Sequence, residues 1–308
     1  WTCDGARLRK EIWLDGVKTP PAQVIGHFNA VIFLPQMLNI LEGGPEERRR
    51  YLNLAIAQAY PVYTRALSEY AQGLTQRNAL LKMLNERGGD RDQLSYWDEI
   101  LASRGAILIN ARIEVIRELE MLAQRIHEKL TGSSEVIQLL YQPSFDPAPP
   151  PEGQFSLPMP VQVQRNGLSA EKVKQAFAAR LQEIRGEEIA RGVTTIGPHR
   201  DEMRVLCNGV DLTDFGSRGQ LRTAILSLKL AEVDWLKQKT TEWPVLLLDE
   251  TLAELDTQRR AFLLDYLSNA GQTLLTTTDM NLFPDEFIDK CARWQVTAGS
   301  VEEISPED

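Results

Sequence analysis

The sequence predicts an α/β protein in which a mixed sheet with flanking helices carries an inserted helical arm. Residues 245–248 are four consecutive aliphatic side chains, typical of a strand buried on both faces at the centre of a parallel sheet. Ser217 precedes an apolar pattern at helical spacing, which predicts a capped helix. Residues 52–131 are almost all helix-forming apart from a break at Gly88-Gly89, which predicts an arm of two long helices.

An acidic pair, Asp249-Glu250, follows the predicted central strand at its carboxyl end, where α/β sheets bind ligands. Two adjacent acids at this place suit nucleotide hydrolysis. Asp249 would hold Mg²⁺, directly or through water, and Glu250 would orient and deprotonate the attacking water. A strand that ends at the surface in two solvated acids is the alternative, and the pair alone does not decide between them.

Residues 215–223 add a second feature upstream of this strand. Ser217 is a good N-cap, and Gly219 lets backbone amides approach a phosphate closely. A helix that begins here presents free N–H groups and the positive end of its dipole, which together form an anion site. An ordinary capped helix remains the alternative.

The order of these features resembles the signature motif, Walker B strand and D-loop of ABC-type ATPase heads, and so a two-lobed ABC/SMC-type ATPase head. The resemblance implies that Glu250 is catalytic, that Asp249 holds Mg²⁺, and that ATP is bound by Ser217, Gly219, Gln220, Asp249 and Asp256. In such heads the signature helix lies on a different lobe from the phosphate loop and faces the ATP of another subunit. The expected assembly is therefore an ATP-dependent homodimer.

The loop that cradles phosphates, G-x-x-x-x-G-K-[ST], occurs nowhere in the chain, which begins at Trp1 rather than Met. We expect this loop to lie in an amino-terminal segment that is missing here, because the other motifs look intact; a decayed site is the alternative. The chain alone would then be inactive as an ATPase. A non-catalytic interaction module stays open as a second class of function.

Several stretches together resemble the RecF family of bacterial recombination proteins, essentially end to end apart from the absent amino-terminal lobe. They are residues 34–53, 197–201, 215–220 and 246–250. The family usually carries a Ser-Pro-Glu-Asp-Leu-like string where this chain has residues 34–38, and Gln36 within it would sit near the nucleotide, as the Q-loop glutamine of ABC heads does. Thr277, Thr278 and Asp279 stand where transporters place a switch histidine, as is typical of RecF-like proteins.

The resemblance implies a DNA repair, replication and recombination mediator connected with the SOS response. It would dimerise on ATP at single-stranded and gapped double-stranded DNA, and hydrolyse ATP slowly as a weak DNA-dependent ATPase. With RecR and RecO it would help RecA replace single-strand-binding protein. Another SMC-like or ABC-type DNA-linked ATPase is the alternative.

Two basic stretches are candidates for DNA contact. Arg48, Arg49 and Arg50 cannot share one helical face, so at least one should point toward the sheet or a partner. The choice is between a solvated first turn that pairs with neighbouring glutamates and a contact with DNA phosphates. His199 and Arg200 should lie in a loop between paired strands at residues 195–196 and 203–206, where Arg200 either contacts phosphate or pairs with a neighbouring acid.

Composition limits the remaining choices. The 308 residues suffice for about two domains, and 43% hydrophobic with 25% charged residues is ordinary for a globular protein. Three isolated cysteines and the lack of a membrane-length apolar run predict a cytoplasmic protein that does not enter membranes. The net charge of −9 is unfavourable for nucleic acid, so a DNA contact needs a local basic face.

Four regions are expected along the chain. Residues 1–44 would be the strand-rich remainder of the first ATPase lobe, 45–142 the arm, 143–160 a linker with seven prolines, and 161–308 the second lobe. Within the last region we expect a strand at 161–164, one helix from Ser169 to about Arg191 and an amphipathic helix at 257–267. A further central strand should follow at 272–279, and the acidic tail of Glu302, Glu303, Glu307 and Asp308 should be disordered.

Overall fold

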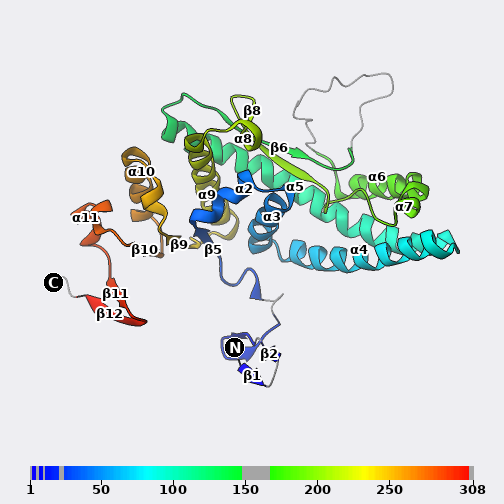
Figure 1. The fold of residues 1–308 in the computed structure, drawn as a ribbon, viewed down its shortest axis with the longest axis horizontal. Helices are drawn as coiled ribbons and strands as arrows, with labels where there is room; N and C mark the ends of the chain where they lie inside the picture. Colours follow the sequence, from blue (N-terminus) through cyan, green and yellow to red (C-terminus); the bar gives the residue numbers. More distant parts are fainter. Residues whose placement is uncertain (1, 5–6, 10, 21–23, 148–166, 305–308) are drawn as a thin grey trace. The chain divides into compact units, whose positions relative to one another are not determined.

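The computed structural model describes residues 2–4, 7–9, 11–20, 24–147 and 167–304 (Figure 1). Helices and both parallel and antiparallel sheets are present, which confirms the α/β class. Two compact units divide the chain: Trp1–Asn29 with Met37–Pro244, and Ala30–Gln36 with Val245–Asp308. The boundaries expected at residues 44, 142 and 160 stay predictions, and the compact units divide the chain at other places.

The first unit contains the arm. Helices α4 (Pro61–Arg87) and α5 (Leu94–Thr131) lie side by side in Figure 1, as the two long helices expected from the sequence. They are joined through Gly88 and Gly89, whose φ angles of 67° and 134° are open to glycine at little cost. Leu81, Leu84 and Leu94 form a buried cluster near this turn.

Helix α9 (Arg218–Thr240) is the most buried helix of the first unit. All residues from 223 to 233 are buried, including polar Thr223 and Ser227. The helix packs against α5 and against α3 (Pro45–Ala59), so it is buried on nearly every side. Its amino-terminal turn, in contrast, is exposed from Ser217 to Gly219.

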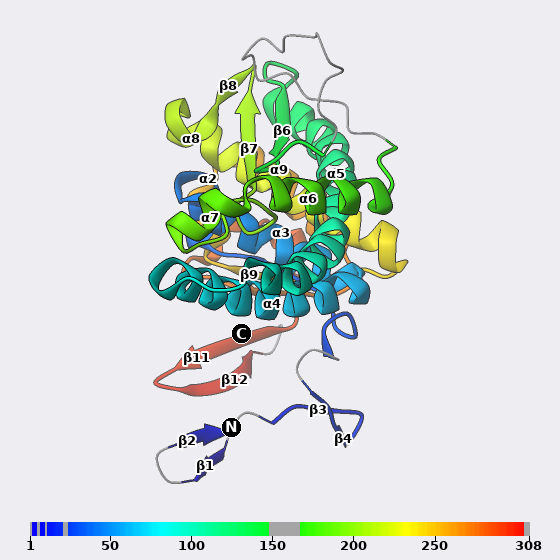
Figure 2. The ribbon, with the colours of Figure 1, turned by 90° about the vertical axis from the view of Figure 1, so that its right-hand side faces the viewer.

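An antiparallel sheet in the order β6-β7-β8 completes this unit (Figure 2). Its strands are β6 (Ile137–Gln142), β7 (Glu202–Cys207) and β8 (Val210–Asp211). The prediction of a strand at residues 195–196 that pairs with residues 203–206 is wrong, because β7 pairs with β6 and β8. The amides of Thr194 and Thr195 donate to the side chains of Asn78 and Glu188, so no sheet partner is needed there.

The single helix expected between Ser169 and Arg191 is two helices. Ser169 caps α6 (Ala170–Glu183), which ends at Ile184, and α7 (Arg185–Arg191) follows directly. The predicted strand at 161–164 and most of the predicted linker lie outside the described residues. Shorter elements of the unit are α2 (Asn39–Glu42), η2 (Arg91–Gln93), α8 (Leu212–Phe215), and the hairpins of β1 (Thr2–Asp4) with β2 (Arg7–Arg9) and of β3 (Trp13–Leu14) with β4 (Val17–Lys18).

The second unit is built on a parallel sheet in the order β10-β9-β5. The central strand β9 (Val245–Asp249) pairs with β5 (Ala30–Phe33) and β10 (Thr273–Thr276). The prediction of a central strand at residues 245–248 is confirmed. Only one of its faces is fully buried, by Leu246 and Leu248.

Two expectations for the second unit need correction. β10 is an edge strand of the described sheet, and Leu274 is half exposed. Glu302 and Glu303 are ordered in β12 (Ser300–Ile304), because this strand pairs antiparallel with β11 (Arg293–Thr297); Glu307 and Asp308 lie outside the described residues. The expected helix at 257–267 is confirmed as α10 (Thr257–Ser268). The shorter elements described in the second unit and at its boundary are α11 (Asp285–Ile288) and the 3₁₀ turns η1 (Pro35–Leu38), η3 (Thr251–Glu254) and η4 (Met280–Leu282).

Within the described part of the chain, no helix combines the length and the apolar character that crossing a membrane requires.

Candidate functional site

The start of α9 has the geometry that the sequence predicts for Ser217. Its Oγ accepts from the Gln220 amide at 3.2 Å, and the Gln220 Oε1 accepts from the Ser217 amide at 3.1 Å. This capping box satisfies two amides that a helix start leaves free. The reciprocal role of Gln220 as a cap was not predicted.

Gly219 lies in this exposed first turn. A Cβ placed on Gly219 would meet no atom within 4 Å, so packing within this chain does not require glycine there. The neighbouring Gly216 differs, since a Cβ there would clash with the Leu212 carbonyl at 2.6 Å. The open space over Gly219 leaves room for a ligand to approach the helix start closely.

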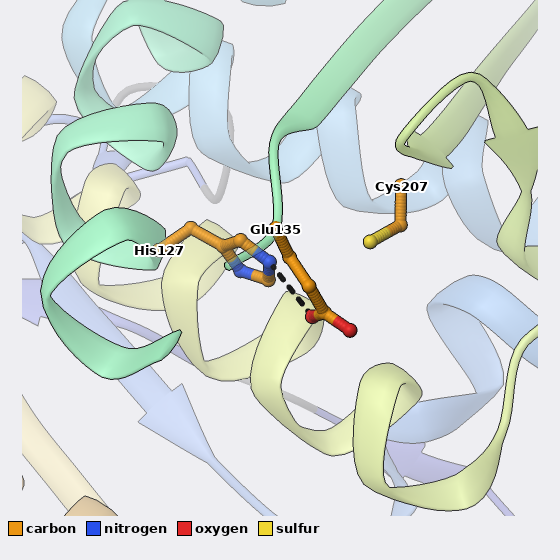
Figure 3. A group of neighbouring side chains, drawn as sticks. All are labelled: His127, Glu135 and Cys207. Carbon is orange, nitrogen blue, oxygen red and sulfur yellow. Dashed lines mark ion pairs between the residues drawn. The ribbon is translucent and has the colours of Figure 1, made fainter. Parts of the chain in front are cut away.

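Gln220 also contacts a partly buried carboxylate, that of Glu135. Its Nε2 donates to Glu135 Oε1 at 2.9 Å, and Glu135 Oε2 lies 3.4 Å from His127 Nε2 (Figure 3). Cys207 completes a set in which one nitrogen, one oxygen and one sulfur lie within 4.8 Å of one another. Burial, and then the charge of Glu135, raise the pKa of the Cys207 thiol to about 11. Sequence analysis missed this cluster, because its members are far apart in the chain and form no motif.

The acidic pair lies at the carboxyl end of β9, as predicted. Asp249 is exposed, and the Thr276 hydroxyl of the neighbouring strand donates to its Oδ1 at 2.6 Å. Glu250 has a φ of 49°, in the left-handed region that non-glycine residues rarely adopt. Such a conformation costs about 1–3 kcal/mol and tends to occur at functional sites. The turn is held by the Thr251 hydroxyl, which donates to the carbonyl of Phe33 at 3.2 Å.

Gln36 and Asp256 belong to the same unit as the acidic pair. Gln36 lies in η1 just after β5, and because β5 and β9 are parallel, both chains leave the sheet at the same edge. Asp256 caps α10 by accepting from the Arg259 amide at 2.9 Å, and this bond holds the pKa of Asp256 below its usual value. Both side chains are exposed.

Arg48 does not have the exposure that a DNA contact needs. It is 5% exposed, and its guanidinium forms two bonds with Glu202, from Nε to Oε1 at 2.8 Å and from Nη2 to Oε2 at 2.9 Å. Hydrogen bonding to Glu202 raises the pKa of Arg48 further. The neighbouring glutamates are not its partners either, so the structure corrects both interpretations of this residue.

The other two arginines of the run remain accessible. Arg50 is exposed, and Arg49 is half-buried with its Nη1 donating to the carbonyl of Asp201 at 2.9 Å. Burial is the main cause that lowers the pKa of Arg49, and the positive charge of Arg112 adds to it. As the spacing predicted, the three side chains of the run point in different directions.

The loop of residues 197–201 is fixed by buried bonds around Asp201. This carboxylate accepts from the Tyr141 hydroxyl, from Arg112 Nη1 at 3.3 Å and from the Ser144 amide at 2.8 Å. Arg112 also donates to the Pro198 carbonyl at 2.6 Å. Asp201 is therefore occupied inside the protein and is no ion-pair partner for Arg200, which is exposed.

His199 is partly buried in this loop. Its Nδ1 lies 2.8 Å from the Tyr70 hydroxyl and its Nε2 lies 3.3 Å from the Thr194 carbonyl. Burial lowers the pKa of His199 to about 4, and the nearby charges of Arg200 and Arg49 act in the same direction. The imidazole is thus neutral at pH 7 and holds the loop in place.

The candidate residues form two groups on the two units. The acidic pair, Gln36 and Asp256 lie in the second unit, at one edge of its sheet or in the loop that follows. The signature residues and the basic residues lie in the first unit: Ser217, Gly219, Gln220, Arg48, Arg49, Arg50, His199 and Arg200. Within the first unit, the bonds of Arg48 and Arg49 tie the start of α3 to residues 201 and 202.

No protein-family model matches the chain. Among known proteins, "DNA replication and repair protein RecF" of Acetivibrio thermocellus is 40% identical over 260 residues, which are 84% of this chain and 66% of that protein. The protein of the same name from Desulforamulus reducens is 36% identical over 292 residues, which are 95% of this chain and 74% of that protein.

The solved structures that this chain resembles belong to the same family as these relatives. A structure of "the recombination mediator protein RecF-ATP in RecFOR pathway" matches with a TM-score of 0.81 at 28% identity, over 96% of this chain and 73% of that chain. A second structure, described in the same words with the ligand written ATPrS, has a TM-score of 0.80 at 28% identity and covers 94% of this chain and 72% of that chain. The chain belongs to the RecF family of DNA replication and repair proteins.

Proposed function

We propose that this chain supplies the signature helix and the acidic pair of an ATP-dependent mediator of DNA repair and recombination. The observation that carries the proposal is the pair of an exposed Asp249 and a half-buried Glu250 at the carboxyl end of the central parallel strand, with Glu250 in a left-handed conformation. The relative described as RecF-ATP supports ATP as the nucleotide.

The residues at the sheet edge fit a magnesium ion. The Asp249 carboxylate is exposed and bonded to the Thr276 hydroxyl of β10, and carboxylate and hydroxyl groups offer the hard oxygens that Mg²⁺ prefers. Asp249 would hold the ion, directly or through water. When bound, the ion would neutralise charge on the nucleotide phosphates.

Glu250 is the proposed general base. Its carboxylate accepts a proton from the water that attacks the terminal phosphate, and the fixed turn after β9 orients it for this role. Gln36, at the same sheet edge, helps to position this water or the nucleotide. Slow turnover is part of the proposal, so that hydrolysis acts as a timer for release from DNA.

The signature residues act on the nucleotide of a second copy. Ser217 and Gly219 present an exposed helix start with open space above the glycine, which suits the terminal phosphate of ATP. Gln220 contributes by capping this helix start. Binding across two copies makes the dimer depend on ATP, because the nucleotide joins surfaces that otherwise have no common ligand. Asp256 belongs to the same interface.

A basic surface formed by Arg49, Arg50 and Arg200 is the proposed DNA contact. Arg49 is bonded to residue 201, next to Arg200, and both arginines are near enough to His199 to lower its pKa. Together with Arg50, which is exposed on the same helix as Arg49, these arginines would supply the local positive charge that a protein of net charge −9 needs for binding DNA phosphates. Arg48 is left out, since its guanidinium is committed to Glu202.

The biological setting follows from the family. We propose single-stranded and gapped double-stranded DNA as the substrates, and RecR, RecO and RecA as partners, in a cytoplasmic pathway. The solved relatives belong to the RecFOR pathway by name, which supports RecR and RecO as partners.

The experiment uses the protein expressed from its complete reading frame. Glu250→Gln removes the base while keeping the shape of the side chain, so ATP should trap a dimer on gapped DNA that is visible by size-exclusion chromatography. Glu254→Gln, a change at another exposed acid four residues on, should behave like the wild type. Monomers alone with ATP in both the wild type and Glu250→Gln would overturn the proposal. Nucleotide-independent DNA binding would then favour a non-catalytic interaction module.

A further inference from the structure

The carboxylate of Glu135 connects the signature turn to the arm. Glu135 lies between α5 and β6, and its carboxylate contacts a different helix through each of its two oxygens. Figure 3 shows the contact with His127. Oε1 accepts from Gln220 Nε2 in the first turn of α9 at 2.9 Å. Oε2 lies 3.4 Å from Nε2 of His127, which is 1% exposed near the carboxyl end of α5.

His127 makes a second connection to the same helix. Its Nδ1 lies 3.0 Å from the Ser227 hydroxyl, about two turns beyond Gln220 of the capping box along α9. Ser227 in turn donates to the Thr223 carbonyl at 2.7 Å. Together Glu135 and His127 fix the first turns of α9 against the base of the long arm helix.

We propose that Glu135 is a positioning residue for the signature turn. By holding the Gln220 side chain, it keeps the capping box closed and sets the direction of the Ser217 hydroxyl and of the free amides. The inference rests on the proposed function, in which this turn faces the nucleotide of a second subunit. Glu135 itself touches no nucleotide there, and it acts only through Gln220.

The same three side chains could be taken for a zinc site, since His127, Glu135 and Cys207 offer nitrogen, oxygen and sulfur ligands. Both oxygens of Glu135 are, however, directed at Gln220 and His127. The bond to Gln220 and the contact with His127 give both oxygens of Glu135 a role without a metal ion, and zinc binding is one outcome of the test.

The chain offers a matched control for Glu135. Glu118 lies on α5 and bridges to the opposite end of α9: its Oε2 accepts from Trp235 Nε1 at 2.7 Å and its Oε1 from Lys239 Nζ at 2.8 Å. Glu135 follows α5 in the chain and reaches this helix through His127, so removing either carboxylate deletes one link between α5 and α9. Only the Glu135 bridge reaches the signature turn.

The test measures two constants on the protein expressed from its complete reading frame. Glu135→Ala should raise the dissociation constant of the ATP-dependent dimer about tenfold or more, the effect expected for a lost charge-assisted hydrogen bond. ATP affinity at concentrations where the protein is monomeric should stay at the wild-type value. Glu118→Ala should leave both constants unchanged, although it lowers the melting temperature.

A conservative pair of variants separates positioning from folding. Glu135→Gln keeps an oxygen that can accept from Gln220, and should restore dimerisation to within about threefold of the wild type. Glu135→Asp is one methylene shorter and should weaken dimerisation as Glu135→Ala does. It supplies the same test if the alanine variant does not fold. Hydrogen exchange at the Gln220 amide should rise in Glu135→Asp and stay at the wild-type rate in Glu135→Gln.

Three results would overturn the inference. Equal dimerisation in Glu135→Ala and Glu118→Ala would show a structural bridge only. Parallel loss of dimerisation and of monomeric ATP affinity would show general damage. Stoichiometric zinc in the wild type that disappears in Cys207→Ser, together with loss of dimerisation on chelation, would make the cluster a metal site. A wild type that does not dimerise on ATP would instead contradict the proposed function.

Discussion

Arg48 and Glu202 lie 154 residues apart in the chain, and their side chains are joined by two parallel hydrogen bonds of 2.8 and 2.9 Å. The third guanidinium nitrogen, Nη1, donates to the Gly43 carbonyl at 2.8 Å and to the Leu41 carbonyl at 3.3 Å, at the end of α2. One arginine thus connects α2, the first turn of α3 and the start of β7. This role is structural, and it separates Arg48 from the two arginines that follow it.

Arg48→Ala should destabilise the protein by about 3 kcal/mol, because it leaves Glu202 and the α2 carbonyls without their partner in a mostly buried place. Arg50→Ala is the control, since Arg50 is exposed on the same helix, and its effect should stay within about 0.5 kcal/mol. Urea unfolding of both variants measures the difference. Equal stability of the two would contradict the structural role of Arg48.

Arg50→Ala and Arg200→Ala should weaken binding to gapped DNA and lower the dependence of affinity on salt by about one charge each. Both side chains are exposed on the proposed basic surface. Arg191→Ala removes an equal charge from α7, where Arg191 pairs with Glu187, and should leave the salt slope unchanged. Fluorescence anisotropy over a salt series gives all three slopes, and identical slopes for all variants would place the DNA elsewhere.

Two substitutions at Ser217 should separate its roles. Ser217→Ala deletes the cap of α9 and should cost about 1 kcal/mol of stability. Ser217→Arg places a bulky charge at the exposed turn, and should block ATP-dependent dimerisation while ATP still binds to the same subunit. Equilibrium dialysis with ATP checks this, and loss of ATP binding by Ser217→Arg would place the serine at its own subunit's nucleotide.

The stability of the protein should depend on pH through His199. The unfolded chain protonates this histidine near pH 6.5, whereas burial lowers the folded pKa to about 4. The neutral ring therefore contributes stability that is complete above pH 6.5 and is lost as the pH falls from 6.5 toward 4, by up to about 1.4 kcal/mol per pH unit.

His199→Asn should flatten this part of the stability curve, although it also weakens the bond to Tyr70. His27→Asn, at an exposed histidine, is the control and should leave the slope as it is. Denaturant unfolding between pH 4 and 7 measures the slopes. An unchanged slope in His199→Asn would show that this ring is not the titrating group.

Local sequence signals predicted the parts of the fold that local physics determines. The aliphatic run predicted the central strand of the parallel sheet, Gly88-Gly89 predicted the turn between the two arm helices, and Ser217 predicted the start of α9. Each of these depends on periodicity, capping or positive φ within a few residues. The stretches at residues 34–53, 197–201, 215–220 and 246–250 also led to the correct family.

Long-range partners were beyond the reach of such signals. Glu202 forms an ion pair with Arg48, and Asp201 accepts hydrogen bonds from Arg112, Tyr141 and Ser144. The charged residues that end the loop at 197–201 are therefore held by buried bonds. The sequence alone gave no way to choose these pairs among the many acids and arginines. The Glu135 cluster was missed for the same reason.

Mixing two inactive variants tests the central claim, which is that the signature turn of one copy completes the nucleotide site of another. Ser217→Arg lacks a working signature turn, and Asp249→Ala lacks the proposed magnesium ligand. In a mixed dimer, the nucleotide site of the first variant meets the signature turn of the second, and both are intact. ATP turnover of the mixture should therefore clearly exceed the sum of the two variants alone; a mixture as inactive as its components would contradict the claim.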